Sequence, residues 1–184
     1  LKGRLGENIA AATLTIRSLP HRKDLPGARA RDSEGVPTRD LVVVEKGKFT
    51  QFLYNLEAAA LDGVAPTGNG VRSVGSKAGT GFKNLVVDAG TSTNAELFAQ
   101  GKMLLIDKLE GAAGCSPISG EMSIGAQGFL YENGERVQAV DRITLSSNFF
   151  DMIRNIEAFS SEYNDQLTSV RVPDMLIGKI AVAG

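Results

Sequence analysis

The chain has 184 residues, which suits one domain or one domain with a small appendage. Hydrophobic residues make up 42% and charged residues 22%, as is ordinary for a globular protein, and the 21 glycines favour hairpins and tight turns over long helices. The net charge of −1 argues against direct nucleic-acid binding, and no apolar run is long enough for a membrane-spanning helix.

The first predicted elements are short strands on either side of a long loop. Residues 12–17 alternate and are β-branched, which is typical of a strand. Residues 18–40 contain prolines, glycines and many charges, and loops of this length are usually functional or mobile. Residues 41–45 and 48–54 are strand-like and flank a Lys-Gly pair, so they predict a hairpin.

A short helix and a glycine-rich loop come next. Asn55 is a favourable N-cap for a helix over residues 56–61, and Gly63 supplies the left-handed residue that ends it. Residues 65–81 are rich in Gly and Ser and predict a loop. Residues 84–88 predict a buried strand.

A second helix and a strand occupy the middle of the chain. Thr93 or Asn94 caps a helix over residues 95–100, and Gly101 ends it. Residues 102–109 predict the strand that follows.

The strongest hairpin signal lies at Asn133 and Gly134, because both residue types tolerate positive φ. The strand-like segments 122–131 and 137–145 flank this pair, and residues 110–120 predict a loop before them.

The clearest predicted helix follows the capping residues 146–148. Its apolar stripe at helical spacing consists of Phe149, Met152, Ile153, Ile156 and Phe159. A final strand is predicted over residues 175–182. Strands joined mainly by hairpins indicate an α+β fold, a largely antiparallel β-sheet domain with a few short helices.

Residues for metal or nucleophile chemistry are few. A catalytic zinc usually has three protein ligands from His, Cys or carboxylate. His21 and Cys115 are the only residues of their types, they lie far apart in sequence, and no H-E-x-x-H motif is present. A lone Cys115 cannot form an internal disulfide, which favours a reducing compartment. We expect an inert Cys115, a solvent-facing His21 and no self-contained active site.

A local cluster of basic residues lies in and beside the long loop. Asp24, Asp32 and Glu34 offset its charge, so a solvated loop is the simpler interpretation. The alternative is a site for phosphate or for a peptide carboxylate. The cluster consists of Arg17, His21, Arg22, Lys23, Arg29 and Arg31.

Two other segments are candidates for function. Residues 67–72 match neither the P-loop pattern nor G-x-G-x-x-G, because Ser73 stands in place of the third Gly. Their small side chains favour a close approach of another backbone, with phosphate binding as the alternative. Glu121 follows Ser119 and Gly120 just before a predicted strand. Its carboxylate is expected either to serve as an acid-base group or to be solvated in a turn.

Several short motifs occur in a fixed order along nearly the whole chain. Each is weak alone, but their order and spacing together are specific. The motifs are 3–7 (GRLGE), 32–38 (DSEGVPT), 44–47 (VEKG), 67–70 (TGNG), 84–85 (NL), 119–123 (SGEMS), 131–135 (YENGE), 173–177 (PDMLI) and 182–184 (VAG). This set resembles the C-terminal region of the TldD/PmbA family, once called modulators of DNA gyrase.

The resemblance implies a two-subunit assembly that degrades or trims peptides in the bacterial or archaeal cytoplasm. The TldD-like subunit carries an H-E-x-x-x-H zinc motif upstream of this region and a Cys ligand in a late loop, whereas the PmbA-like (TldE-like) subunit lacks the zinc motif. The corresponding loop here, residues 160–172, holds no Cys, so we expect a PmbA-like chain. The missing initiator Met suggests that residues 1–184 form a single C-terminal domain of a longer polypeptide.

The resemblance therefore predicts a non-catalytic subunit without a cofactor of its own, the zinc being held by a catalytic partner. The expected partners are a TldD-like subunit or a second copy of the chain, and a peptide substrate, but no nucleic acid and no membrane. The expected cavity-wall residues are Gly68, Asn69, Gly70, Arg72, Ser119, Gly120 and Glu121. Two alternatives stay open: a stand-alone protein- or ligand-binding module, and a C-terminal fragment of a catalytic TldD-like subunit.

Overall fold

The structure is a computed structural model that describes residues 3–111, 114–163 and 168–184. Its internal contacts divide the chain into two compact units, each described here by itself. Unit 1 comprises Leu1–Asn8, Leu14–Asp88 and Tyr163–Val172. Unit 2 comprises Ile9–Thr13, Ala89–Glu162 and Pro173–Gly184.

Unit 1 is built on a five-stranded sheet of order β11-β6-β1-β2-β3. Its strands are β1 (Ile16–Ser18), β2 (Leu41–Glu45), β3 (Lys48–Phe49), β6 (Leu85–Val87) and β11 (Val170–Arg171). Neighbours are antiparallel except β11 and β6, which are parallel. The buried apolar side chains of this unit are Leu14, Leu25, Val43, Val44, Phe49, Ala59, Val86 and Val87.

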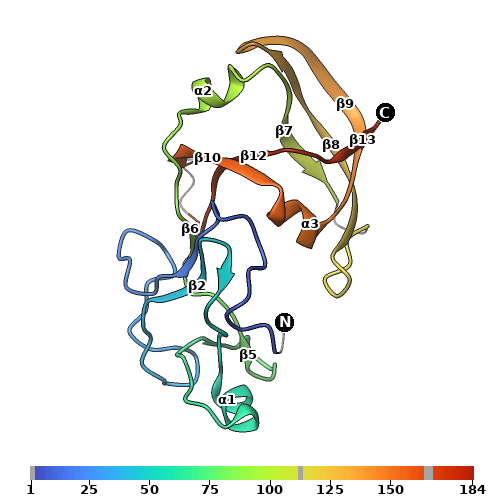
Figure 1. Cartoon of the computed structure of the whole chain (residues 1–184). Helices are drawn as coiled ribbons and strands as arrows, with labels where there is room; N and C mark the ends of the chain where they lie inside the picture. The colour runs from blue at the N-terminus through green and yellow to red at the C-terminus, as the bar shows by residue number, and fades with distance from the viewer. Residues whose placement is uncertain (1–2, 112–113, 164–167) are drawn as a thin grey trace. The chain divides into compact units, whose positions relative to one another are not determined.

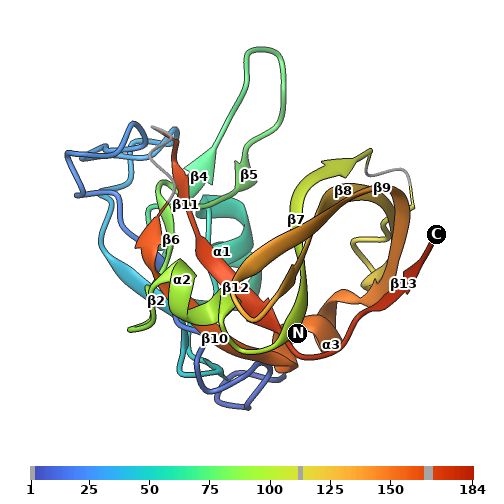
Figure 2. The ribbon, with the colours of Figure 1, turned by 90° about the horizontal axis from the view of Figure 1, so that it is seen from above.

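A helix and a small hairpin complete unit 1. The helix α1 (Leu56–Asp62) begins at Asn55, whose side chain accepts a hydrogen bond from the Ala58 amide, and ends at Gly63 in the left-handed conformation. The strands β4 (Gly70–Val71) and β5 (Gly79–Thr80) pair antiparallel. The loop that joins them extends well beyond the two short strands (Figure 2).

Unit 2 contains a four-stranded antiparallel sheet of order β13-β9-β8-β7. The strands are β7 (Lys102–Glu110), β8 (Glu121–Glu132), β9 (Glu135–Asn148) and β13 (Ala181–Ala183). The three long strands curve together side by side (Figure 1). One face of the sheet is buried through Ile124, Ala126, Ile143 and Leu145. A two-stranded sheet of β10 (Ile156–Tyr163) and β12 (Pro173–Ile177) belongs mostly to the same unit.

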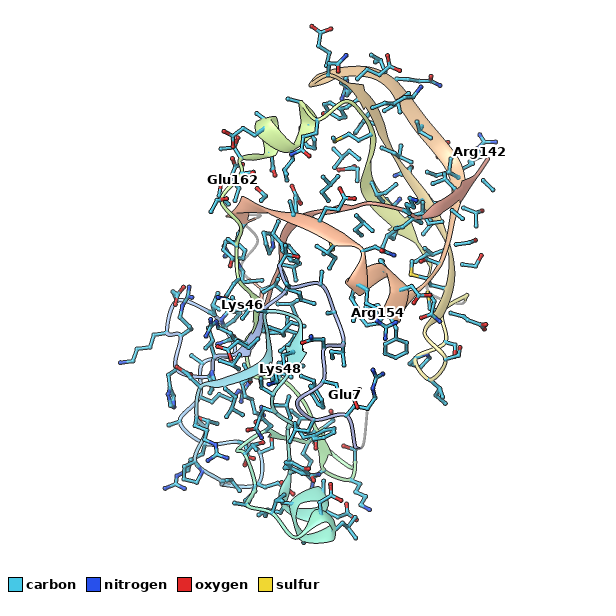
Figure 3. All side chains as sticks on the ribbon, viewed as in Figure 1. Glu7, Lys46, Lys48, Arg142, Arg154 and Glu162 are labelled. Carbon is cyan, nitrogen blue, oxygen red and sulfur yellow. The ribbon has the colours of Figure 1, made fainter. Side chains whose placement is uncertain are left out.

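The turn chemistry predicted from the sequence is confirmed. Lys46 lies in the turn of the β2–β3 hairpin (Figure 3). Lys46 and Gly47 have φ of 47° and 80°. Asn133 and Gly134 have φ of 52° and 88° in the β8–β9 hairpin. Two positive φ angles in a two-residue turn match the twist of the flanking strands. The prediction of a largely antiparallel α+β fold is therefore confirmed.

The second helix is also where the sequence places it. The helix α2 (Asn94–Phe98) begins at Thr93, whose hydroxyl accepts from the Glu96 amide while the Glu96 carboxylate accepts from the Thr93 amide. This reciprocal pair satisfies two amides at the helix start that would otherwise have no partner in the protein.

The prediction of a helix reaching Phe159 is wrong. The helix α3 (Phe149–Arg154) stops after six residues, and Ile156 opens strand β10 instead. The carbonyl of Asn155 accepts from the Gly178 amide, and β10 pairs with β12. Pairing with a distant strand therefore overrides the local helical spacing.

Three predicted strand boundaries need correction. The strand expected at 48–54 ends at Phe49, and the one expected at 12–17 is limited to β1. The final strand is split into β12 and β13, and a β-carbon at the intervening Gly178 would collide with the Glu157 carboxylate. The late segment 160–172 is not simply a loop, because β10 continues to Tyr163 and β11 follows; residues 164–167 lie outside the described residues.

Candidate functional site

Asp32 joins the long loop of unit 1 to the glycine-rich loop. Its Oδ1 accepts from the amides of Glu34 and Val36 at 2.9 and 3.0 Å, and its Oδ2 accepts from the amide of Gly70 at 2.8 Å. The Ser33 amide donates to the Gly70 carbonyl at 3.1 Å. Hydrogen bonds thus connect the motif at 32–38 directly to the motif at 67–70.

Asn69 anchors the glycine-rich loop from inside. Only 2% of its surface is exposed. Its Oδ1 accepts from the Thr67 hydroxyl at 2.8 Å, while its Nδ2 donates to the Ser18 hydroxyl at 3.3 Å and to the Gly81 carbonyl at 3.1 Å. A buried amide with both ends satisfied fixes the loop in one position.

Asn84 does the same for the long loop. It is fully buried, accepts from the Gly27 amide at 2.9 Å and donates to the Leu19 carbonyl at 3.0 Å. A β-carbon on Gly27 would collide with the carbonyl of Lys83, so glycine is required at this close approach. The loop at residues 18–40 is therefore tied to the sheet over its first part.

These two fixed loops form the walls of a pocket of about 580 Å³ in unit 1. The long loop contributes Arg29 and Ser33, and the β4–β5 hairpin contributes Arg72 and Lys77. Lys83 follows the hairpin. Among the residues that the structure describes, the lining consists of Pro26, Gly27, Arg29, Ser33, Val71, Arg72, Ser73, Ser76, Lys77, Gly79, Phe82, Lys83 and Ser169.

The lining carries four cationic side chains and, among the described residues, no carboxylate. Lys77 is paired with Glu57 at 2.7 Å outside the lining. Lys83 is 7% exposed, and its ammonium donates to the Gly70 carbonyl at 2.6 Å. Burial lowers the pKa of Lys83, with Arg29 acting in the same direction and Asp32 opposing it.

Most side chains of the basic cluster predicted from the sequence have separate partners in ion pairs or hydrogen bonds. Arg17 binds Asp88 through two nitrogens, Arg22 binds Asp24, and Arg31 donates to the Gly35 carbonyl. His21 lies 3.6 Å from Asp40, and both side chains are about half exposed. Within the described part of the chain, Arg29 has no ion pair or side-chain hydrogen bond, and it is the member of the cluster that lines the pocket.

The seven predicted cavity-wall residues fall into three environments. Arg72 lines the pocket, and its Nε donates to the Ser76 carbonyl at 3.1 Å. Gly68, Asn69 and Gly70 are buried, and they hold the backbone of the glycine-rich loop beside the long loop. That they also contact a peptide stays a prediction.

The remaining three, Ser119, Gly120 and Glu121, lie in unit 2 at the turn before β8. The Asn148 side chain donates to the Ser119 carbonyl at 2.9 Å, and the Phe149 amide donates to the Gly120 carbonyl. The Ser119 and Glu121 side chains are exposed, which leaves them available to solvent or a ligand. Their role at a peptide cavity also stays a prediction.

Sequence reasoning missed Lys83, Ser33 and Ser169 as parts of the pocket. The available signal in the sequence is a lysine between Phe82 and the apolar segment 85–87, where a strand is predicted. A buried lysine is rare without a function or a partner.

A metal does not fit the residues that the structure describes. No group of three or more His, Cys, Asp or Glu side chains is placed to hold an ion in the ranges 3–111, 114–163 and 168–184. Cys115 is exposed in unit 2 and His21 is half exposed in unit 1. Over the same ranges, no helix combines the length and hydropathy needed to span a bilayer.

Comparison with known protein families places residues 1–184 under one description, the PmbA/TldA metallopeptidase C-terminal domain. The chain is 34% identical over 177 residues to the Metalloprotease PmbA of Escherichia coli O157:H7, covering 94% of the chain and 37% of the relative. It is 33% identical over 162 residues to a metalloprotease of Archaeoglobus fulgidus, covering 85% of the chain and 37% of that protein.

Solved structures give the same result. A Thermotoga maritima protein described as a modulator of a DNA gyrase matches with a TM-score of 0.91 and 36% identity, over 100% of this chain and 42% of that one. TldE from Thermococcus kodakarensis matches with a TM-score of 0.91 and 27% identity, over 99% and 42% respectively. The chain thus spans well under half the length of these proteins.

Proposed function

Because the chain belongs to the PmbA/TldD family of metallopeptidases, we propose that it is the C-terminal domain of a non-catalytic, PmbA-like subunit in a zinc peptidase assembly. The observation that carries this proposal is the likeness to TldE and PmbA over almost the whole chain. The absence of Cys from residues 160–172 agrees with it, because the resemblance implies a ligand there in a catalytic subunit.

The proposed task is scaffolding. The polypeptide would pair with a TldD-like subunit, or with a second copy of itself, and help to enclose a peptide in the cytoplasm. The zinc would be held by the catalytic partner. An extended peptide lying along a sheet edge gains affinity from main-chain hydrogen bonds without sequence choice. Such binding suits an assembly that degrades or trims varied peptides.

The scaffolding proposal is tested by the zinc content of the full-length polypeptide purified alone. Inductively coupled plasma mass spectrometry is expected to find far less than one zinc per chain. The variants His21→Ala and Cys115→Ser serve as controls, because neither is expected to change that value. One equivalent of zinc that either substitution removes would contradict the proposal, since the ligands would then come from this region.

A catalytic TldD-like identity is tested separately by the upstream reading frame. An H-E-x-x-x-H motif there, together with one equivalent of zinc, would assign the chain to a catalytic subunit. An upstream region without that motif supports the PmbA-like assignment.

A further inference from the structure

The cationic pocket of unit 1 has no task in the scaffolding proposal. We propose that it binds a small oxyanion, a phosphate or carboxylate group, through Arg29, Arg72 and Lys83. This inference does not rest on the peptidase assignment, because it follows from the charges, donors and size of the pocket.

The positive charge around the pocket is only partly compensated. Of the four lining cations, Lys77 is neutralised by Glu57 at 2.7 Å, and Lys83 lies in the field of the buried Asp32. Arg29 and Arg72 have no carboxylate partner among the described residues. Like charges gathered around one cavity repel each other, so a bound anion lowers the energy of all of them.

The pocket lining also has hydrogen-bond donors for which no partner is described. An ammonium has three N–H groups, and the one hydrogen bond described for Lys83 goes to the Gly70 carbonyl. Arg72 uses its Nε on the Ser76 carbonyl, which leaves its two terminal nitrogens. The hydroxyls of Ser33 and Ser169 line the same pocket without a described side-chain hydrogen bond. Guanidinium groups bind carboxylate and phosphate through paired hydrogen bonds.

The pocket has a size suited to a ligand, and hydrogen bonds fix the backbone of one of its walls. A cavity of about 580 Å³ is in the range of ligand sites, which is about 300–1,000 Å³. The Asp32 and Asn84 hydrogen bonds hold the long loop in place. The backbone that carries Arg29 is thus set before a ligand arrives, so binding has to order the arginine side chains but not the loop.

The test is isothermal titration calorimetry of the full-length polypeptide at low ionic strength. The titrants are inorganic phosphate, the dipeptide acetyl-Gly-Gly and its C-terminal amide. The variants are Arg29→Gln and Arg72→Gln, whose exposed side chains do not support the core. Arg142→Gln is the matched control, because its side chain is 90% exposed, belongs to unit 2 and lies at the outer margin of its sheet (Figure 3).

The expected result is saturable binding of phosphate, of the dipeptide acid, or of both, at one site. Arg29→Gln and Arg72→Gln should each weaken it by about tenfold or more, because each removes a charge-assisted contact, whereas Arg142→Gln should change it by less than about twofold. Binding of phosphate alone identifies a phosphate ligand, and binding of the acid but not its amide identifies a free carboxylate.

Three outcomes overturn the inference. These are no saturable binding of either anion, saturable binding of the dipeptide amide that equals that of the acid, or binding that Arg29→Gln and Arg72→Gln weaken no more than Arg142→Gln does. None of them changes the zinc content of the polypeptide, so failure here is distinct from failure of the scaffolding proposal.

Discussion

Replacing Asn84 by Ala should destabilise unit 1 more than any exposed polar substitution, because this side chain alone ties the long loop to the sheet at two points. It is fully buried, and it bonds the Gly27 amide at 2.9 Å and the Leu19 carbonyl at 3.0 Å. The substitution leaves the buried Gly27 amide without its partner, whereas the Leu19 carbonyl keeps the Arg22 amide at 3.2 Å, so the expected loss is about 1–3 kcal/mol.

The assay is urea unfolding followed by circular dichroism, combined with hydrogen exchange at the Gly27 amide. The control is Asn8→Ala, since Asn8 is exposed and no side-chain hydrogen bond is described for it. That variant should stay within about 0.5 kcal/mol of the parent. The reasoning is refuted if Asn84→Ala costs less than about 1 kcal/mol, or if the Gly27 amide keeps its protection.

Three further predictions concern a glycine of the unit 2 sheet, the two ends of the predicted helical stripe, and the titration of Asp24. Gly128→Ala should lower the free energy of unfolding in urea by about 1–3 kcal/mol, because its β-carbon would collide with the backbone of β7. Gly125→Ala should cost little, because its β-carbon would come no closer than 3.3 Å to its nearest neighbour, the β-carbon of Glu110. Phe159→Ala should lower the free energy of unfolding by about 3–5 kcal/mol and Phe149→Ala by much less, since the two side chains are 3% and 47% exposed. Equal losses would instead support the single helical stripe that the sequence predicted. Carbon NMR should find the pKa of the Asp24 carboxyl lowered to about 2, because the hydrogen bond from its arginine partner stabilises the carboxylate. Its contribution to stability is then complete above pH 3.8 and is lost as the pH falls through about 2; a midpoint at 3.8 would show that the pair does not form.

Local chemistry explains why much of the fold could be predicted. The turns at 46–47 and 133–134 require residues that accept positive φ, and the sequence places Lys-Gly and Asn-Gly there. The caps at Asn55 and Thr93 act through hydrogen bonds within four residues. Such features depend on neighbours in the sequence, so a single sequence is enough to find them.

The failures have the opposite character. Ile156 follows Phe149, Met152 and Ile153 at helical spacing, but its strand is specified by pairing with β12 and by the Asn155–Gly178 hydrogen bond. Those partners lie about twenty residues away, and no local pattern reports them.

The candidate site was foreseen only in part for the same reason. Arg29 and Arg72 were each singled out, but in two separate segments with separate interpretations. The buried side chains of Asp32, Asn69 and Asn84 bring those segments together, across up to 57 residues of sequence in the case of Asn84 and Gly27. The glycine-rich segment at 67–72, which looks like a ligand-binding loop, mainly connects the glycine-rich loop to the long loop by hydrogen bonds. The pocket lies beside it.

Reconstitution of the assembly tests whether the polypeptide is a non-catalytic subunit. Peptidase activity is measured for the full-length polypeptide alone, for a TldD-like subunit from the same cell alone, and for their mixture, with zinc determined in each subunit. We expect no activity from the polypeptide alone, activity in the mixture, and zinc in the partner. Zinc-dependent hydrolysis by the polypeptide alone would contradict this expectation.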